Sequence, residues 1–425
     1  MSTELYLAFG KNSVLLGMEL CKLMASPNCN ASLIISSALS HLVPATFRQN
    51  TMTPVLEIPA QAAGTEPVSV DVMKRSLECY LTIRRSNEPG AVGAIVDVGL
   101  LRSMRWLVDV FYHNHIPITG FFTSSAFSTV MDYDASTQDD KSVGLLGCLP
   151  GWGFAGVGPK VIGLSGPGDH PPWMGFTKKF MGVMINTVDD LERPYVEDLA
   201  KKLKLRVWPV GPLLPREYFS LVGTAVRSSN EGEASVIDWL DSRPRRSVLF
   251  VSSVDLTAEE YPLLVDALKA STHYFIWVVR PGGYYPEVDD SVREKGLITS
   301  EMVPNCMVLN HPSTAAFLSN CSWEPLMEAI GLGVPILAWP KTSDQLYNAK
   351  LVVKRLKVGY CVCDKFSHMV NGLVTVKGMG KGIDALMGDK YMEGRAADLG
   401  ARFSWGFPQS SRDALVRFKD DLALL

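Results

Sequence analysis

Short apolar runs alternate along this chain with longer segments of helical period, and this alternation most restricts its fold. In the first half, apolar runs at 5–9, 31–36, 92–98 and 118–122 alternate with helical segments at 14–24, 104–113 and 126–133. Such alternation is typical of βαβ units, which build parallel sheets. A second series occupies 248–252, 259–271, 274–279, 307–309, 314–319, 325–332 and 334–338. The sequence therefore predicts an α/β fold with two doubly wound, Rossmann-like domains.

The length of the chain agrees with two domains. Its 425 residues are 47% hydrophobic, which is enough for two cores of ordinary size. Between the two series, the segment 208–235 opens with Pro and Gly and ends in small polar and acidic residues, as expected of an exposed linker. We place the boundary near Gly232, with an N-terminal domain at 1–232 (linker at 215–235) and a C-terminal domain at 233–409. Residues 410–425 have helical period and are predicted to form a terminal helix.

Charge, hydropathy and cysteine usage exclude several classes of protein. Lys and Arg number 41 against 44 Asp and Glu, so no strong field draws the chain to nucleic acid or anionic lipid. No long uninterrupted apolar stretch predicts membrane insertion, and the N-terminus does not have the pattern of a signal peptide. The closest cysteines, Cys361 and Cys363, lack the two-residue gap usual for zinc ligands. We expect a cytoplasmic protein with reduced thiols, no metal and a small-molecule partner.

Ligands of open α/β sheets bind beyond the carboxyl ends of the strands, so the loops that follow strands are the candidate site. Asp97 ends a predicted strand, and we expect the two domains to face each other across a cleft. Aromatic residues near such loops predict an apolar pocket for a planar metabolite, with core packing as the alternative. The predicted substrate-binding residues are Phe9, Asn12, Phe122, Thr123, Phe127, His170 and Trp173. No G-x-G-x-x-G motif follows a strand, so nicotinamide or flavin binding is not indicated.

Four segments resemble landmarks of the plant family of UDP-sugar-dependent glycosyltransferases, in that family's order. They are MINTVDDLERPYVEDL (184–199), VWPVGPLL (207–214), VIDWLDSRPRRSVLFVS (236–252) and the donor-sugar box at 302–350. The resemblance implies a GT-B fold whose N-terminal half binds an acceptor and whose C-terminal half binds a nucleotide sugar. It also implies that the terminal helix packs back on the N-terminal domain.

The chain departs from the family at the residues to which the family assigns the chemistry. The general-base His of the first loop falls on Ser13, whereas the Asp that orients it matches Asp97. A serine hydroxyl has no pKa near 7 and cannot replace an imidazole base. We therefore predict Asp97 as the catalytic acid or base and Ser13 as its hydrogen-bond partner. The alternative for Ser13 is a cap on the helix that begins near Val14.

The donor-sugar box is altered at several positions. The resemblance places Met302 at the uracil-stacking Trp, Asn305 at a Gln, and Asn320 and Pro325 at the diphosphate-binding His and Ser. The adjacent Glu324 adds a carboxylate, and Pro325 has no N–H for an anion at the helix start.

The turn that includes Ser253 has lost the Gly that approaches phosphate. Glu328 matches the ribose-binding Glu, and Asp344 with Gln345 matches the pair that holds the sugar hydroxyls. The sequence thus predicts a degenerate donor site, with UDP-sugar binding weak or lost and no cofactor.

Three functions remain open at this point. The first is an enzyme that has lost its sugar donor and converts a hydrophobic plant specialised metabolite by cyclisation, isomerisation or elimination. The second is a residual UDP-glycosyltransferase that acts on a small-molecule hydroxyl. The third is a non-catalytic metabolite-binding protein or a partner of other biosynthetic enzymes. The missing His and the lost diphosphate contacts favour the first, because each unmade buried hydrogen bond costs about 1 to 3 kcal/mol.

Overall fold

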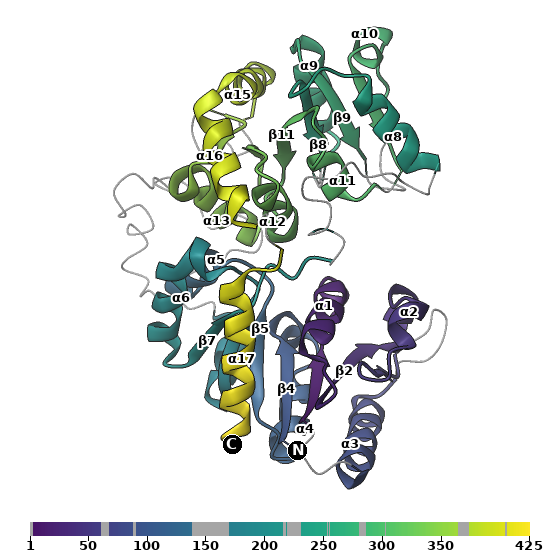
Figure 1. The fold of residues 1–425 in the computed structure, drawn as a ribbon, viewed down its shortest axis with the longest axis vertical. Coiled ribbons are helices and arrows are strands. Elements are labelled where there is room, and N and C mark those ends of the chain that lie inside the picture. Colours follow the sequence, from purple (N-terminus) through teal and green to yellow (C-terminus); the bar gives the residue numbers. More distant parts are fainter. Residues whose placement is uncertain are drawn as a thin grey trace. The chain divides into compact units, whose positions relative to one another are not determined.

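Two parallel sheets organise the chain in the computed structural model (Figure 1). The structure describes residues 3–60, 68–87, 91–137, 170–215, 218, 231–252, 254, 256–279, 286–301, 303–363, 374–403 and 406–425. The contacts divide the chain into two compact units. The N-terminal unit comprises the described residues of 1–130, 170–214 and 408–425, and the C-terminal unit comprises those of 131–169 and 215–407.

The sheet of the N-terminal unit has seven parallel strands in the order β3-β2-β1-β4-β5-β6-β7. Its strands are β1 (Thr3–Ala8), β2 (Cys29–Ser36), β3 (Val55–Ile58), β4 (Ala91–Asp97), β5 (Ile118–Phe122), β6 (Phe180–Ile185) and β7 (Arg206–Pro209). Its α-helices are α1 (Val14–Met24), α2 (Ala45–Arg48), α3 (Val70–Asn87), α4 (Trp106–His113), α6 (Asp189–Leu203) and α17 (Gln409–Ala423). Helix α5 (Ala126–Thr137) begins in this unit, and short 3₁₀ segments lie at η1 (Ser37–Leu42), η2 (Val98–Arg102) and η5 (Pro172–Lys179). The strand order reverses between β1 and β4, so the loops after these two strands flank the expected ligand crevice.

The C-terminal unit has six parallel strands in the order β10-β9-β8-β11-β12-β13. Its strands are β8 (Val248–Val251), β9 (Tyr274–Val278), β10 (Gly296–Thr299), β11 (Thr314–Ser319), β12 (Ile336–Ala338) and β13 (Gly359–Cys361). Its α-helices are α8 (Glu231–Asp241), α9 (Glu260–Ala270), α10 (Asp290–Arg293), α11 (Asn305–Leu309), α12 (Trp323–Gly331), α13 (Ser343–Lys350), α15 (Val376–Gly388) and α16 (Lys390–Gly400). A π-helical segment, η6 (Leu351–Leu356), continues α13, and η7 (Ala401–Phe403) continues α16. The predicted α/β class with two parallel Rossmann-like sheets is confirmed.

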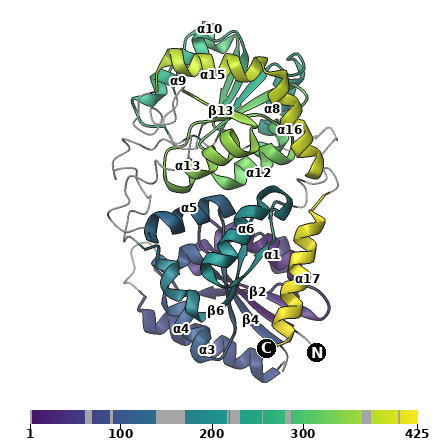
Figure 2. The same ribbon diagram turned by 90° about the vertical axis from the view of Figure 1, so that its left-hand side faces the viewer.

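Helices cover each sheet, which explains the continuous apolar runs of the central strands (Figure 2). All five residues of β5 and all four of β8 are buried. Parallel strands buried on both faces read as uninterrupted apolar runs rather than as an alternating pattern. In the C-terminal unit the core includes Trp277 and Trp339, which are both almost fully buried.

Helix α17 packs on the sheet of the N-terminal unit (Figure 1). The Phe418 ring lies edge-on to Trp208 of β7, with 5.2 Å between ring centroids. Ser411 Oγ donates a hydrogen bond to the Gly211 carbonyl oxygen at 2.5 Å. The chain therefore returns to its first sheet at its C-terminal end. The boundary near Gly232 stays a prediction, because residues 219–230 lie outside the described part.

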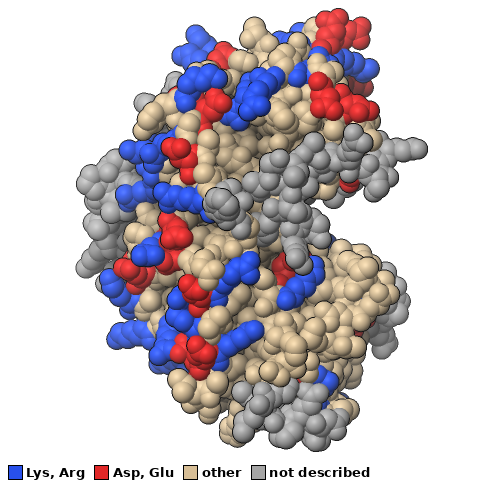
Figure 3. All heavy atoms as spheres, in the orientation of Figure 1, with Lys and Arg blue, Asp and Glu red and all other residues tan. Residues whose placement is uncertain are grey.

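The surface of the described residues carries charges of both signs. Basic and acidic side chains are interspersed over the face shown in Figure 3. Among the described residues, no helix is long and apolar enough to cross a membrane. No cluster of three potential metal-ligating side chains occurs within the same residues.

Candidate functional site

The two predicted catalytic residues meet at the point where the N-terminal sheet reverses its strand order. Ser13 Oγ donates a hydrogen bond of 2.5 Å to Asp97 Oδ2. Asp97 Oδ1 accepts a second hydrogen bond, of 2.8 Å, from the Gly99 backbone N–H. Because β1 and β4 are neighbours, the loop after β1 and the end of β4 bring these side chains together across 84 residues of sequence.

The helix-cap alternative for Ser13 is wrong in its chemistry. Ser13 occupies the position before α1, but its side chain makes no capping hydrogen bond to that helix. Its hydroxyl instead accepts from the Gly10 backbone N–H at 3.1 Å while donating to Asp97. The Ser13 hydroxyl therefore binds the Gly10 turn and the Asp97 carboxylate, and it does not cap α1.

Burial sets the electrostatics of this pair. Only 6% of Asp97 and 2% of Ser13 is exposed. Desolvation raises the pKa of Asp97 above its usual range, and the hydrogen bonds from Ser13, Gly99 and Gly10 oppose the rise without cancelling it. A carboxylate with a raised pKa is a better proton acceptor than a solvated one. Asp97 is thus a buried base candidate that reaches its surroundings through Ser13.

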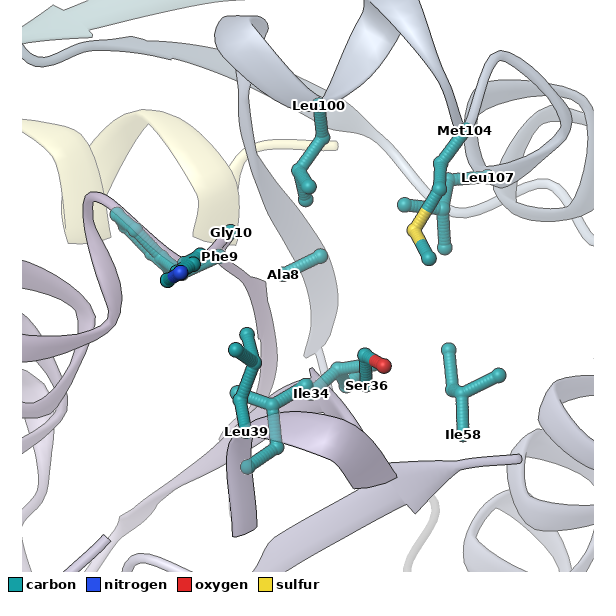
Figure 4. Close-up of a pocket in the computed structure, with 12 residues that line it drawn as sticks. Ala8, Phe9, Gly10, Ile34, Ser36, Leu39, Ile58, Leu100, Met104 and Leu107 are labelled. Carbon is teal, nitrogen blue, oxygen red and sulfur yellow. The ribbon is translucent and has the colours of Figure 1, made fainter. Parts of the chain in front are cut away.

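A cavity of about 230 Å³ lies beside this pair at the carboxyl ends of β1, β2 and β3 (Figure 4). Gly10 belongs both to the cavity lining and to the turn that binds Ser13. A side chain at Gly10 would meet Leu100, another lining residue, and would lie 3.7 Å from Asp97 Oδ2. The cavity therefore adjoins the Ser13–Asp97 pair. Its lining consists of Ala8, Phe9, Gly10, Lys11, Ile34, Ile35, Ser36, Leu39, Ile58, Leu100, Met104 and Leu107.

Of the predicted aromatic pocket residues, only Phe9 lines this cavity. The Phe9 ring also packs edge-on against Phe121, with 5.1 Å between the ring centroids. Phe122 packs edge-on against Trp173 and Phe127 against Tyr195, at 5.0 and 4.9 Å. These rings are largely buried, which agrees with the packing alternative. Asn12 and His170 are exposed, and Thr123 is half-buried.

Sequence reasoning missed most of the cavity lining. The missed side chains come from strand ends at Ile34 and Ile58 and from the segment after β4 at Leu100, Met104 and Leu107. Their apolar character was visible in the sequence. It was equally compatible with core packing, so the strand neighbours were needed to separate the two roles.

Glu192 is a second buried acid that sequence reasoning missed. Its carboxylate accepts hydrogen bonds from the backbone N–H groups of Ala126 and Phe127, each at 2.9 Å. The Thr187 hydroxyl donates to the same group at 2.5 Å. Burial is the main influence on Glu192 and raises its pKa. All three donors are groups of the protein itself, and two of them are the first backbone N–H groups of α5. Glu192 therefore stabilises the start of α5.

In the C-terminal unit, a hydrogen-bonded chain of three side chains ends at Glu328, which the resemblance matched to the ribose-binding Glu. Ser252 Oγ donates to Asn305 Oδ1 at 2.9 Å, and Asn305 Nδ2 donates to Glu328 Oε2 at 3.1 Å. Ser252 directly follows β8, whereas Asn305 begins α11 and Glu328 lies on α12. The structure thus brings Asn305 and Glu328 into hydrogen-bond contact.

Glu324 stands one helical turn before Glu328 on α12. Burial, reinforced by the neighbouring Glu328 charge, raises the pKa of Glu324 to about 7. Burial likewise raises the pKa of Glu328 to about 7, opposed by the hydrogen bond from Asn305. Near neutral pH the pair is therefore partly protonated. A diphosphate would meet less negative charge there than the two carboxyl side chains alone suggest.

The remaining residues of the predicted donor site stabilise their own loops. Asn320 Oδ1 accepts from the Ser322 backbone N–H at 3.0 Å. Gln345 Oε1 accepts from the backbone N–H groups of Lys341 and Thr342, and Gln345 Nε2 donates to Ser322 Oγ at 3.2 Å. Asp344, in the first turn of α13, is half-buried.

Two predicted donor-site residues, Ser253 and Met302, lie outside the described residues. His311, which matches the family box, is explained by local structure instead. Its Nε2 atom lies 3.1 Å from Asp241 Oδ1, and its Nδ1 atom accepts from the Ser313 backbone N–H.

Part of the chain is similar to known proteins. Residues 231–391 match the family model described as UDP-glucoronosyl and UDP-glucosyl transferase. UDP-glycosyltransferase 73C3 of Arabidopsis thaliana is 33% identical over 248 residues, which cover 52% of this chain and 49% of the relative. Scopoletin glucosyltransferase of Nicotiana tabacum is 36% identical over 196 residues, covering 43% of this chain and 40% of the relative. The matched regions span half or less of the length of these relatives.

Solved structures match the fold over the whole chain. A transferase from Siraitia grosvenorii in complex with UDP superposes with a TM-score of 0.75 at 20% identity, covering 99% of this chain and 100% of that one. The structure of Phytolacca americana UGT2, complexed with UDP-2fluoro-glucose and pterostilbene, gives a TM-score of 0.73 at 20% identity, with 100% of both chains covered. These matches confirm the predicted GT-B fold.

Proposed function

Because the chain is a relative of the plant UDP-glycosyltransferases and has their GT-B fold, we propose that it transfers a sugar from a UDP-sugar to an oxygen atom of a small hydrophobic acceptor. This is the glycosyltransferase alternative of the sequence analysis. The relation to enzymes of this family favours it over loss of the donor. Binding of a hydrophobic acceptor is supported by the apolar cavity beside the hydrogen-bonded Ser13–Asp97 pair.

The Ser13–Asp97 pair supplies a route for a proton in place of the missing imidazole. An acceptor hydroxyl that attacks the sugar carbon must lose its proton. Ser13 Oγ already donates to Asp97, so it can take that proton while passing its own to the Asp97 carboxylate. The raised pKa of Asp97 favours this transfer. An acceptor that is already an anion needs no such step.

The C-terminal unit retains some of the residues that bind the sugar donor in the family. Glu328 and Gln345 match residues that hold the ribose and the sugar in the family, and both are linked to neighbouring loops by hydrogen bonds. Near neutral pH, the partly protonated Glu324 reduces the repulsion that its carboxylate would exert on a diphosphate. We therefore expect UDP-sugar binding weakened by the altered contacts but retained.

Titration calorimetry with UDP and UDP-glucose tests this proposal. We expect dissociation constants in the micromolar range. Glu328→Ala should lower the affinity at least tenfold, because the ribose hydroxyls lose their hydrogen-bond acceptor. Glu294→Gln, at an exposed position in the same unit, is the matched control and should bind as the unaltered protein does. Absence of heat with either nucleotide would rule out the transfer reaction.

The donor-independent conversion is the second candidate, and one observation favours it. Asn305, whose amide oxygen accepts from Ser252 Oγ, already donates to the Glu328 carboxylate that a ribose would need. Under this alternative Asp97 is the acid or base and the cavity holds the reactive conformer. It predicts no binding of UDP together with a chemical change in a metabolite incubated alone. A protein that binds the metabolite without changing it would be the non-catalytic alternative.

A further inference from the structure

Both polar side chains that line the acceptor cavity can donate hydrogen bonds. Its lining is apolar except for two side chains, Lys11 and Ser36. Lys11 is its one charged lining residue, and Figure 4 shows the Ser36 hydroxyl pointing toward the space bounded by Ile58 and Met104. Within the described part of the chain, neither side chain has an ion pair or hydrogen bond of its own. An ammonium and a hydroxyl together match an anionic oxygen ligand.

The base candidate beside the cavity is poorly accessible to a neutral hydroxyl. Only 2% of Ser13 is exposed, and its hydroxyl already donates to Asp97 and accepts from Gly10. Asp97 is covered by Ser13 on one oxygen and by the Gly99 N–H on the other. An acceptor that arrives ionised would avoid this obstacle, because it has no proton to lose.

We propose that the acceptor is a small hydrophobic carboxylic acid, held by Lys11 and Ser36 at the mouth of an apolar cavity, and that the product is a sugar ester. The inference rests on the proposed transfer reaction and specifies its substrate class. The cavity of about 230 Å³ is smaller than the roughly 300 to 1,000 Å³ of ordinary ligand pockets, so it suits a one- or two-ring acid.

The chemistry balances without a general base. A carboxylate oxygen attacks the anomeric carbon of the UDP-sugar and forms the ester C–O bond. The bond from that carbon to the β-phosphate oxygen breaks, and UDP leaves with the electron pair. No proton is released, since the carboxyl group is ionised at neutral pH. The Lys11 charge orients the acid before attack and offsets the repulsion between two anionic substrates.

Binding of trans-cinnamate and cinnamyl alcohol, measured by calorimetry without any sugar donor, tests the recognition step. The two probes share one ring and differ in the carboxylate. We expect cinnamate to bind more tightly, and Lys11→Gln to weaken cinnamate about fivefold or more while leaving the alcohol unchanged. Lys11→Arg should retain the preference, and Lys201→Gln, at an exposed site in the same unit, is the control. Equal binding of the probes, or equal weakening of both by Lys11→Gln, would overturn the proposal.

Product analysis with UDP-glucose separates this inference from the function on which it rests. We expect a cinnamate product that mild alkali cleaves, as an ester requires. Asp97→Asn should lower the rate of transfer to cinnamyl alcohol about 100-fold or more, a larger factor than for cinnamate, because only the alcohol has a proton to lose to the base. Transfer to cinnamyl alcohol but not to cinnamate would overturn the acid preference and keep the transferase. Cinnamate binding through Lys11 without any transfer would contradict the transferase instead.

Discussion

At the residue scale, the acid pair on α12 links the donor site to stability. Burial raises the pKa values of Glu324 and Glu328 to about 7 from the ordinary 4.5. Between these values the folded protein holds protons that the unfolded chain has released. The free energy of unfolding therefore falls as pH rises from about 4.5 to about 7 and levels off above that. At about 1.4 kcal/mol per pKa unit, each of the two acids contributes on the order of 3 kcal/mol to this fall.

The variant Glu324→Gln should remove part of this pH dependence, because an amide does not ionise. We expect its Tm to exceed that of the unaltered protein at about pH 8 and to approach it at about pH 5. Calorimetric melting at both pH values measures the difference, with the exposed Glu294→Gln as control. Parallel pH profiles for Glu324→Gln and the unaltered protein would show that Glu324 is not desolvated as described.

The sequence could predict the Ser13–Asp97 pairing but not its consequences. The family resemblance matched Ser13 and Asp97 to a catalytic pair, and the position of Asp97 at the end of a predicted strand agreed with that match. Burial and the Gly10 contact depend on three-dimensional packing, which a single sequence does not encode in any local pattern. The same limit hid Glu192, whose two backbone donors, Ala126 and Phe127, lie 66 and 65 residues earlier in the chain.

At the element scale, α1 packs closely on the end of β1 because Gly17 has no side chain. A Cβ atom at Gly17 would lie 2.6 Å from Phe9 Cγ. The Phe9 ring also contacts Phe121, so it has little room to move. We expect Gly17→Ala to lower the free energy of unfolding by about 1 to 3 kcal/mol, the usual cost of overpacking.

A matched helix glycine serves as the control for this prediction. Gly394 lies inside α16, and a Cβ atom there would meet nothing within 4 Å. Gly394→Ala should therefore stabilise the protein by up to about 1 kcal/mol through helix propensity alone. Thermal melting of both variants is the measurement. If the two substitutions shift Tm in the same direction, the steric account of Gly17 is wrong.

Central elements were more predictable than edge elements for a physical reason. Strands β1, β2, β4 and β5 are long, apolar runs buried on both faces, and the sequence indicates each of them. The edge strands β3 and β7 have only four residues, of which several are exposed or half-buried, so no pattern distinguishes them from loops. The segment 307–309 was counted in the second alternating series and lies in the short helix α11, which illustrates how ambiguous a three-residue apolar run is.

At the scale of the whole molecule, the N-terminal unit is completed by the last residues of the chain. Besides the Phe418 contact with Trp208, Leu422 of α17 lies so close to Gly93 of β4 that a Cβ atom there would meet it at 2.9 Å. Lys419 Nζ donates to the Met24 carbonyl oxygen at 2.9 Å. The stability of the first unit therefore includes the contacts made by α17.

Truncation of one buried α17 side chain should destabilise the N-terminal unit and leave the C-terminal unit unchanged. Phe418 is fully buried, so Phe418→Ala should cost about 3 to 5 kcal/mol. Val416, on the same helix, is 57% exposed, and Val416→Ala should change stability by less than about 0.5 kcal/mol. Hydrogen exchange followed by mass spectrometry should show faster exchange in β4 and β7 of Phe418→Ala, while β8 and β11 keep their protection because they belong to the other unit. Equal loss of protection in both sheets would mean that the two units unfold together, and the C-terminal helix would then stabilise the whole chain rather than its first sheet.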